Sequence, residues 1–336
     1  MLKGILAQIK PGIWRSGMEG DIMPTVTIGL PVFNGEAFLH QAVDSILAQT
    51  YTDFELLISD NCSTDGTAAI CQSYLTADQR IRYMRQPENI GAAKNYNKLV
   101  ALSSGKYFKW AAHDDVLAPR FLEECVRALE RDPGVVLAFT RTQLIGEDGE
   151  PIPARPVHNG RPLPDRDPPS SSDFVIGKVR GADYQQTASP DPVARFREVL
   201  FTYDSTYPVF GVMRRSALER TRRHDSYFGS DRVLLAHLAL LGRYARIDAP
   251  LFLNRTHPGQ ASSLSRRNRA RWITGGHRWT FQPIRQVVGC IVAIFEADLT
   301  MQQRWQCLVV RWQLLFRRGR MRQIAHLLLH PDNVPP

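Results

Sequence analysis

The sequence predicts an α/β fold, with a mostly parallel sheet, helices on both of its faces and a C-terminal extension of amphipathic helices. From Thr25 onward, short apolar segments of strand length alternate with amphipathic segments of helix length, and the connections between them are short. This alternation is typical of parallel strands joined by helical crossovers. Beyond about residue 271 the apolar side chains recur at helical spacing, which predicts the extension.

The first half of the chain predicts strands and helices in alternation. Runs of apolar residues predict strands at 26–33, 54–60, 81–85, 106–112 and 135–140. Helical spacing predicts helices at 36–49, 91–102 and around 121–129. A cap-like Ser-Thr-Asp-Gly at 63–66 predicts one more helix, which follows the cap and ends at about residue 74.

The second half is less regular. Residues 146–173 are rich in Pro, Gly, Ser and charge, which predicts a long loop, and helices are expected around 193–201 and 231–241. In the tail, one helical face is predicted to carry Trp305, Leu308, Val309, Trp312, Leu315 and Phe316. The predicted parts are an N-terminal extension (1–23), a first half (24–145), a second half (146–262) and a basic helical tail (263–336).

Composition excludes several classes of protein. With 43% hydrophobic and 22% charged residues in 336, the chain can bury a sizeable core. The longest apolar run, Val287 to Phe295, is far shorter than the roughly 20 residues that cross a bilayer, and the N-terminus lacks the apolar core of a secretory signal. The five cysteines form no CxxC pair, so we expect neither a zinc knuckle nor a disulfide framework, and a reducing, cytoplasmic compartment fits best.

The positive charge is concentrated at the C-terminal end. From Arg255 onward there are thirteen arginines, no lysine and three acids, whereas the remainder has 29 basic and 30 acidic residues. Such an asymmetry predicts a tail that meets an anionic partner. No nucleic-acid recognition motif accompanies the charge, and four tryptophans, at 272, 279, 305 and 312, lie among the arginines. An anionic membrane surface is therefore the favoured partner, with packing on the core as the alternative.

Polar residues follow several of the predicted strands, where open parallel sheets bind ligands. No GxGxxG follows the first strand and no GxxxxGK[ST] occurs, so a dinucleotide fold and a phosphate loop are not supported. Three motifs stand out: Pro31-Val32-Phe33-Asn34 with Glu36; Asp60 with Ser63-Thr64-Asp65-Gly66-Thr67; and Asn89, Gly91, Lys94 and Asn95. A fourth is the acidic pair of His113-Asp114-Asp115.

In this order and spacing the motifs resemble those of the family 2 glycosyltransferases with a GT-A fold. The resemblance is strongest over 24–145, the implied donor half, and thinner to residue 262, the implied acceptor half. It implies nucleotide binding by Pro31, Phe33, Asn34, Glu36, Asp60, Asn89, Lys94 and Asp114. A carboxylate at Asp60 is able to accept the ring N–H of uracil, and a turn-forming Asp is the alternative. Glu36 has the alternative of favouring the first turn of its helix, and Asp65 is interpreted as a helix N-cap.

The resemblance also implies a metal site, in which Mn²⁺ or Mg²⁺ neutralises the diphosphate leaving group. Asp115 is the implied metal ligand and Asp114 the ribose or sugar contact. The family's fuller motif has an acid where this chain has Ala112, and a related form has only the adjacent pair. A solvated acidic turn is the alternative for both aspartates.

On the acceptor side, Asp231 in Gly-Ser-Asp-Arg matches the family's catalytic base, which takes the proton of the acceptor hydroxyl. Asp225 is the second candidate, and a helix N-cap is the alternative role of Asp231. Arg255 and His257 match an Arg-x-His segment that implies diphosphate contacts, with His257 also a metal ligand. Gly211 is expected to allow close approach in the pocket, where arginines 214 and 215 are either contacts or a solvated pair.

The hypothesis is an inverting glycosyltransferase that moves a sugar from a nucleoside diphosphate, with UDP the first expectation, to a hydroxyl acceptor of cell-surface polysaccharide or glycolipid. It is expected at the cytoplasmic face of the membrane as a peripheral protein. The alternative is a catalytically inactive nucleotide-sugar-binding or membrane-associated scaffold protein. A nucleotidyltransferase is disfavoured because its Gly-rich basic loop is absent.

Overall fold

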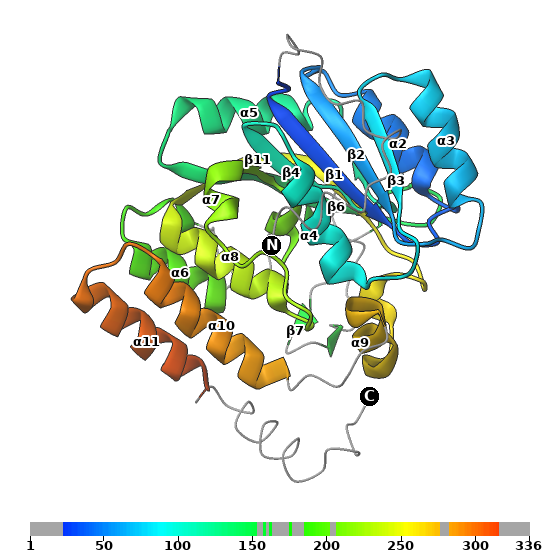
Figure 1. Ribbon diagram of the computed structural model, residues 1–336. Helices are drawn as coiled ribbons and strands as arrows, with labels where there is room; N and C mark the ends of the chain where they lie inside the picture. Colours follow the sequence, from blue (N-terminus) through cyan, green and yellow to red (C-terminus); the bar gives the residue numbers. More distant parts are fainter. Residues whose placement is uncertain are drawn as a thin grey trace.

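The computed structural model describes residues 23–152, 157–158, 161–162, 175–176, 185–201, 206–275 and 282–315. Within these ranges, one sheet of nine strands runs through the molecule and helices cover both of its faces (Figure 1). The predicted fold class is confirmed, including the C-terminal helices. The N-terminal extension, most of the loop 146–173 and the tail beyond residue 315 lie outside the described residues.

The first half of the chain supplies four parallel strands in the order β3-β2-β1-β4: β1 (Val26–Val32), β2 (Phe54–Asp60), β3 (Ile81–Arg85) and β4 (Tyr107–Trp110). Every residue of β1 and β2 is buried, as expected for near-continuous apolar runs in a sheet covered on both faces. The two strands pair in register from Val26–Phe54 to Val32–Asp60, so their carboxyl ends coincide.

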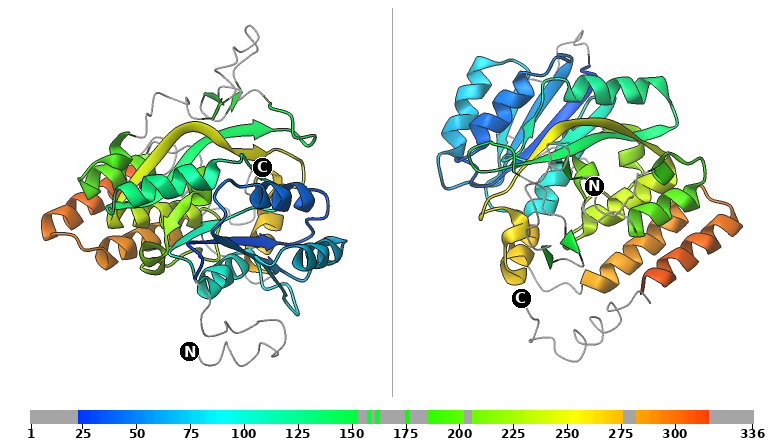
Figure 2. Two further views of the ribbon diagram at one scale, coloured as in Figure 1. Left: turned by 90° about the horizontal axis from the view of Figure 1, so that it is seen from above. Right: turned by 180° about the vertical axis from the view of Figure 1, so that it is seen from behind.

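Four helices alternate with these strands: α2 (Leu39–Leu47), α3 (Thr67–Ala77), α4 (Ala92–Leu102) and α5 (Phe121–Arg131). The buried side chains of α2, α3 and α5 share one apolar cluster, while Leu99 and Val100 of α4 belong to the other, on the opposite face of the sheet. The two views of Figure 2 show this division of the helices between the faces.

The sheet continues in mixed directions. The first half of the chain adds β5 (Val116–Leu117) and β6 (Val135–Ile145), and the second half adds β9 (Val175–Ile176), β10 (Val212–Arg214) and β11 (Arg243–Arg255). The short β10 lies antiparallel between β4 and β6, and β11 runs parallel to β6 with irregular register near Pro250. Pairing of Leu253 with Val116 brings the end of β11 beside the acidic pair.

The remaining helices pack on the α4 side or follow β11. They are α6 (Pro192–Phe201), α7 (Arg215–Glu219), α8 (Ser230–Leu241), α9 (Arg266–Thr274), α10 (Gln282–Glu296) and α11 (Met301–Leu315), with 3₁₀ turns η3 (Gln185–Ala188), η4 (Tyr207–Phe210) and η5 (Ala261–Ser263). A two-stranded hairpin joins β7 (Val157–His158) to β8 (Arg161–Pro162). Among the residues described, no helix combines the length and the apolar character needed to span a bilayer.

The side of α11 that is buried lies opposite the predicted apolar stripe. On α11, Cys307, Val310, Arg311 and Leu314 are buried, whereas Trp305 and Trp312 of the predicted apolar stripe are more than 60% exposed. Cys307, Val310 and Leu314 belong to the apolar cluster that residues of α6 and α10 also form. Phe316, also in the predicted stripe, lies outside the described residues.

Candidate functional site

Loops from the ends of β1, β2, β4 and β11 meet at one edge of the sheet. The last pair of β1 and β2 sets Val32 beside Asp60. Gly35, in the loop after β1, lies against the His113 ring, so close that an added Cβ would be 2.8 Å from it. His257, after β11, contacts Asp114. The structure thus brings together the motifs that the sequence places far apart.

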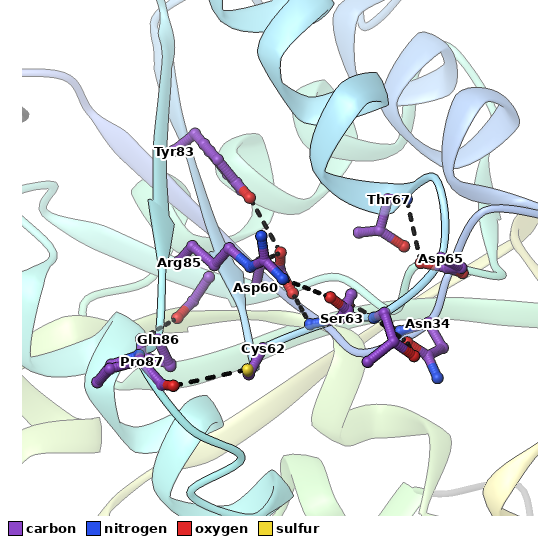
Figure 3. A network of polar contacts seen from close by, with 12 residues as sticks. Asn34, Asp60, Cys62, Ser63, Asp65, Thr67, Tyr83, Arg85, Gln86 and Pro87 are labelled. Carbon is purple, nitrogen blue, oxygen red and sulfur yellow. Dashed lines mark hydrogen bonds and ion pairs between the residues drawn. The ribbon is translucent and has the colours of Figure 1, made fainter.

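Asp60 lies at the centre of a polar network (Figure 3). One of its carboxylate oxygens accepts the backbone N–H of Ser63 (2.8 Å), and the other accepts the Tyr83 hydroxyl (2.9 Å). The Arg85 guanidinium is 3.5 Å from the second oxygen, and it also donates to the Ser63 carbonyl. The side chain of Asp60 is fully buried, so the turn that was the alternative interpretation is present in the structure.

Asn34 and Glu36 hold the two loops together. Asn34 has a positive φ of 52°, its Oδ1 accepts the Thr64 N–H (2.9 Å) and its own N–H donates to Ser63. Glu36 accepts the N–H of Gly66 (2.8 Å), the residue before α3. The Glu36 carboxylate therefore stabilises the N-terminus of α3. The alternative interpretation from the sequence placed it at the first turn of its own helix, α2.

Asp65 lies one residue before the N-cap position of α3, which Gly66 occupies. Its carboxylate accepts the N–H groups of Thr67 (3.1 Å) and Glu36 (3.1 Å). Asp65 thus binds the start of the helix, close to the predicted N-cap role. These bonds lower its pKa, although burial alone would raise it.

Asn89 and Lys94 stand at the start of α4. The Oδ1 of Asn89 accepts the side-chain N–H of Asn61 and the backbone N–H of Gly91, both at 2.9 Å. Lys94 is exposed to solvent, as a residue that meets an anionic ligand must be. Gly91 has a φ of 82° and touches Gly275 at the end of α9, where an added Cβ would be 2.6 Å from the Gly275 nitrogen.

Pro31 and Phe33 complete the predicted nucleotide wall. Pro31 is buried within β1, while Phe33, just after the strand, is half-buried. Phe33 is therefore the better placed of the two to meet a base or ribose.

Asp114 and His257 form a hydrogen-bonded pair, with 2.9 Å between the histidine Nε2 and the carboxylate. The Phe38 ring packs against the imidazole at 4.8 Å between centroids. Burial alone would raise the pKa of Asp114, but the bond to His257 and the charges of His113 and His257 hold it below its usual value. The pair thus favours the anionic form of the Asp114 carboxylate.

Asp115, the residue after Asp114, is buried. Its Oδ1 accepts the Asn254 side-chain amide (2.9 Å) and the Arg255 backbone N–H (3.0 Å). Burial, and then the neighbouring charge of Asp114, raise its pKa well above the usual value. Its other oxygen makes no hydrogen bond within the described part of the chain.

The residues present fit a magnesium or manganese ion that is held partly by its substrate. In the described ranges, no three His, Cys, Asp or Glu side chains gather into a metal-binding group. Mg²⁺ is usually bound by one or two carboxylates together with substrate phosphates and water, so a complete protein cage is not required. The second carboxylate oxygen of Asp115 remains available as a ligand for such an ion.

Arg255 has a different environment from the one expected of a diphosphate ligand. It is 1% exposed, and its Nε donates to the Asp114 carbonyl (2.9 Å). Its Nη1 donates to the carbonyls of Gly146 (2.9 Å) and Glu147 (2.8 Å), and its Nη2 to Gln41. All three nitrogens are bonded to protein, so we now interpret Arg255 as the residue that ties the acidic loop to the end of β6.

Asp231 lies in the first turn of α8, whose N-cap is Gly229 with a φ of 87°. Its carboxylate accepts the Thr206 hydroxyl and the Arg232 backbone N–H. The predicted N-cap role is therefore not the one observed. Asp225, the second candidate, is half-exposed and 3.7 Å from Arg285.

Tyr96 and His224, which sequence reasoning missed, join the donor and acceptor sides. Burial raises the pKa of Tyr96, and the charges of Asp114, Asp115 and Asp231 raise it further. The His224 ring packs on Tyr96 at 5.1 Å. Only the position of Tyr96 next to Asn95 of the third motif offered a signal.

His224 is held at its backbone by Asn97 of α4, which accepts its N–H (3.0 Å) and donates to its carbonyl (2.6 Å). Burial lowers the pKa of His224 to about 4 despite the charge of Asp231, so its imidazole is neutral at neutral pH. Its Nε2 is buried with no hydrogen-bond partner among the residues described. The clamp fixes the loop that leads to Asp231.

The strand at 212–214 serves the sheet and not the pocket. Arg214 donates to the carbonyls of Leu129 (2.5 Å) and Val135 (2.7 Å), and Arg215 donates to the Gly105 carbonyl (2.7 Å). Gly211 allows close approach of the β6 backbone, where an added Cβ would be 2.5 Å from a carbonyl. Both guanidinium groups therefore bind backbone carbonyls of neighbouring elements.

Comparison with known proteins gives a consistent answer. A family model described as Glycosyl transferase family 2 matches residues 27–220, more than half of the chain. The putative teichuronic acid biosynthesis glycosyltransferase TuaG of Bacillus subtilis is 33% identical over 129 residues, which are 38% of this chain and 51% of TuaG. A chondroitin synthase of Escherichia coli is 32% identical over 130 residues, 39% of this chain and 19% of that protein. The chain thus spans about half or less of the length of these curated relatives.

Solved structures share the fold. Residues 1–349 of S. aureus TarS in complex with UDP-GlcNAc superpose with a TM-score of 0.61 at 15% identity, covering 91% of this chain and 75% of that chain. The mannosyltransferase PcManGT of Pyrobaculum calidifontis, in complex with GDP-Man and Mn²⁺, gives 0.54 at 14% identity, covering 94% and 77%. With the GT-A fold, the motifs gathered at its strand ends and the matching family model, the chain belongs to glycosyl transferase family 2.

Proposed function

We propose that the protein is an inverting glycosyltransferase that moves a sugar from a UDP-sugar to a hydroxyl acceptor. The observation that carries the proposal is the meeting of strand-end loops at one edge of the sheet, where His257 after β11 bonds to Asp114 after β4 and His224, in the loop before Asp231, packs on Tyr96 of α4 at 5.1 Å. One site for the leaving diphosphate and one base for the acceptor are what a single displacement requires.

For the donor, the loops after β1 and β2 form the nucleotide site. Asp60 is fixed by Ser63 and Tyr83, and its remaining lone pairs are the acceptors for the uracil N–H. The ribose and phosphates are bordered by Phe33, Asn34, Asn89 and the exposed Lys94. Pro31 and Glu36 support the loop that follows β1. The structure of TarS with UDP-GlcNAc supports UDP as the nucleotide of the donor. The structure of PcManGT with GDP-Man makes GDP the competing nucleotide to test.

Asp115 would hold Mn²⁺ or Mg²⁺ through its available oxygen, with Asp114 and His257 beside it. When bound, the ion supplies Lewis-acid neutralisation of the diphosphate charge. Asp114, kept ionised by His257, contacts the ribose or the sugar. His257 would meet the phosphates or the ion through its second ring nitrogen.

Asp231 is the proposed base. As the acceptor oxygen attacks the anomeric carbon, the carboxylate takes the acceptor proton, the bond between that carbon and the β-phosphate oxygen breaks, and UDP leaves with the electron pair. The attack comes from the face opposite the leaving group, so the anomeric configuration inverts. Thr206 orients the carboxylate by donating its hydroxyl hydrogen.

Relatives in surface-polymer synthesis support the acceptor class. TuaG is named for teichuronic acid biosynthesis and another relative is a chondroitin synthase. We therefore propose that the acceptor is a growing cell-surface glycan or a glycolipid, and that the protein works in the cytoplasm as a peripheral protein at the inner face of the plasma membrane.

Replacing Asp231 with Asn tests the assignment of the base. We expect Asp231→Asn to lower sugar transfer by about 10²–10⁴-fold, because the amide cannot accept the proton, while UDP affinity stays unchanged. Transfer is measured as UDP release from a panel of UDP-sugars with glycan acceptors, and affinity by calorimetry.

The matched control is Asp225→Asn, the neighbouring acid that is partly exposed to solvent. It should leave transfer close to that of the wild type. Full turnover by Asp231→Asn would contradict the proposed base, and loss of transfer only in Asp225→Asn would move the role to that residue. UDP binding without any transfer by the wild type would favour the non-catalytic alternative.

A further inference from the structure

The hairpin of α10 and α11 carries two apolar stripes on opposite sides. The inner stripe packs on α8 and α6, and Figure 1 shows α11 as the outermost helix of this layer. The inner stripe consists of Cys290, Ala293, Ile294 and Ala297 from α10 and its end, and Cys307, Val310, Arg311 and Leu314 from α11. Both helices use the same spacing, so they present equivalent sides to the core.

The outer stripe repeats in the same way. Ile284, Val288 and Phe295 follow the spacing i, i+4 and i+11 on α10, and Met301, Trp305 and Trp312 follow it on α11. At about 100° per residue these positions lie roughly opposite the inner stripe. Their side chains are between 51% and 77% exposed. Together with Val309, these six residues are called the outer apolar face.

Exposed side chains of this size on one face mark a binding surface, because isolated proteins rarely expose large contiguous apolar patches. The charges near the face indicate what it binds. Both acids of the hairpin are neutralised, Glu296 by Arg222 at 3.0 Å and Asp298 by Arg220 at 2.5 Å. The Arg304 guanidinium lies over the Phe295 ring at 5.9 Å.

The sequence that follows adds more positive charge. Between residues 316 and 336 it contains Arg317, Arg318, Arg320 and Arg322, and a single acid, Asp332. No unpaired carboxylate on the described part of the hairpin opposes an anionic partner, and the chain continues directly into a basic run.

We propose that the outer apolar face binds the surface of an anionic lipid bilayer. Tryptophan suits the boundary between headgroups and acyl chains, because its ring is apolar and its N–H is polar. Amphipathic helices with tryptophan and phenylalanine on one side and arginine nearby bind such boundaries in the plane of the membrane. Arginines close to the surface are attracted to anionic headgroups.

A second copy of the chain fits the face less well. A symmetric dimer brings the same surface of both subunits together, so it would bring the Arg304 guanidinium that lies over Phe295 toward the same cation of the partner. The inference deepens the proposed location at the membrane and does not depend on which sugar is transferred.

The test measures co-sedimentation of the purified full chain with vesicles. One set contains phosphatidylcholine alone and the other phosphatidylcholine with phosphatidylglycerol. We expect the wild type to bind the anionic vesicles, and the double variant Trp305→Ala/Trp312→Ala to bind them at least about tenfold more weakly. The matched control is Gln302→Ala/Gln306→Ala, two exposed residues on another side of α11, and it should bind like the wild type.

UDP affinity, measured in parallel, shows whether each variant is folded and keeps this test separate from the proposed function. Lack of vesicle binding by the wild type would overturn the inference. So would unchanged binding by the tryptophan variant, because the arginines alone would then explain attachment. A wild-type dimer that becomes monomeric in the tryptophan variant, with no vesicle binding, would assign the face to self-association.

Discussion

Lys109 is an ionisable side chain enclosed by the sheet. It is fully buried in β4, where its ammonium donates to the carbonyls of Trp110 (3.0 Å) and Phe210 (2.6 Å). It also lies 4.7 Å from the centre of the Phe121 ring. Burial lowers its pKa to about 7, although the charge of Asp115 opposes this effect.

A pKa that is lower in the folded chain gives a defined pH dependence. Between about pH 7 and the ordinary lysine value of about 10.4, the unfolded chain binds more protons than the folded one, so stability rises with pH. We expect the free energy of unfolding of the wild type, relative to Lys109→Met, to increase by up to about 1.4 kcal/mol per pH unit in this window. Urea unfolding at several pH values measures it.

The control is Lys106→Met. Lys106 directly precedes β4, but its side chain is exposed and pairs with Glu130 at 2.7 Å. Because that ion pair raises the pKa of Lys106, the stability that Lys106 contributes is lost only above this pH window. The free energy of unfolding of the wild type relative to Lys106→Met should therefore not rise within the window. Parallel stability profiles for wild type and Lys109→Met would contradict the buried-amine account.

Single residues also show why motifs predict positions better than roles. The sequence analysis expected ligand contacts from Glu36 and Arg255, and in the structure both bind protein groups: Glu36 the start of α3, and Arg255 the carbonyls around Gly146. A carboxylate or a guanidinium has the same chemistry toward a ligand as toward a backbone group. Only the three-dimensional partner distinguishes the two roles, and sequence spacing does not contain it.

Among the elements, α9 is held to the start of α4 by two glycines. Gly91 and Gly275 both have positive φ, 82° and 70°, and their backbones touch. An added Cβ at Gly275 would be 2.8 Å from the Gly91 nitrogen and 2.9 Å from the Asn89 carbonyl. This contact joins the tail to the loop that carries the third motif.

We expect Gly275→Ala to destabilise the protein by more than the roughly 1 kcal/mol of a left-handed alanine, because the methyl group also meets backbone. The variant should bind UDP more weakly, since the Asn89 loop must move. Thermal unfolding and calorimetric UDP titration check the two effects.

Gly149→Ala is the matched control. Gly149 also has a positive φ, 88°, but the nearest atom to an added Cβ is 3.9 Å away. It should therefore show the backbone strain without the collision. Equal destabilisation by the two substitutions would contradict the account of a tight contact between α4 and α9.

The elements of the donor half were predictable because each is locally consistent. The β2 and β3 strands have the predicted bounds, since their apolar runs end at polar turns. The antiparallel insertion of β10 was not predictable, because three residues in length give no period and their partners on β4 and β6 are far away in sequence. The stripe on α11 was found, but periodicity alone does not say whether an apolar stripe faces the core or the outside.

At the scale of the molecule, the sheet separates two apolar cores, and the site lies at the edge where its two halves meet. The donor half contributes Asp60 and the acidic pair, and the acceptor half contributes Asp231 and His257. His257 bonds to Asp114 across these halves, and His224 packs on Trp110 at 4.7 Å. These two contacts join the two halves of the chain at the candidate site.

The measurement that tests the central claim most directly is calorimetric titration of the full chain with UDP, GDP and dTDP, each with Mn²⁺ and with EDTA. We expect UDP to bind most tightly, its affinity to fall in EDTA, and Asp115→Asn to reduce the difference between the two conditions. Binding of GDP in preference to UDP, or an affinity for UDP that neither EDTA nor Asp115→Asn changes, would contradict a metal-assisted UDP-sugar transferase.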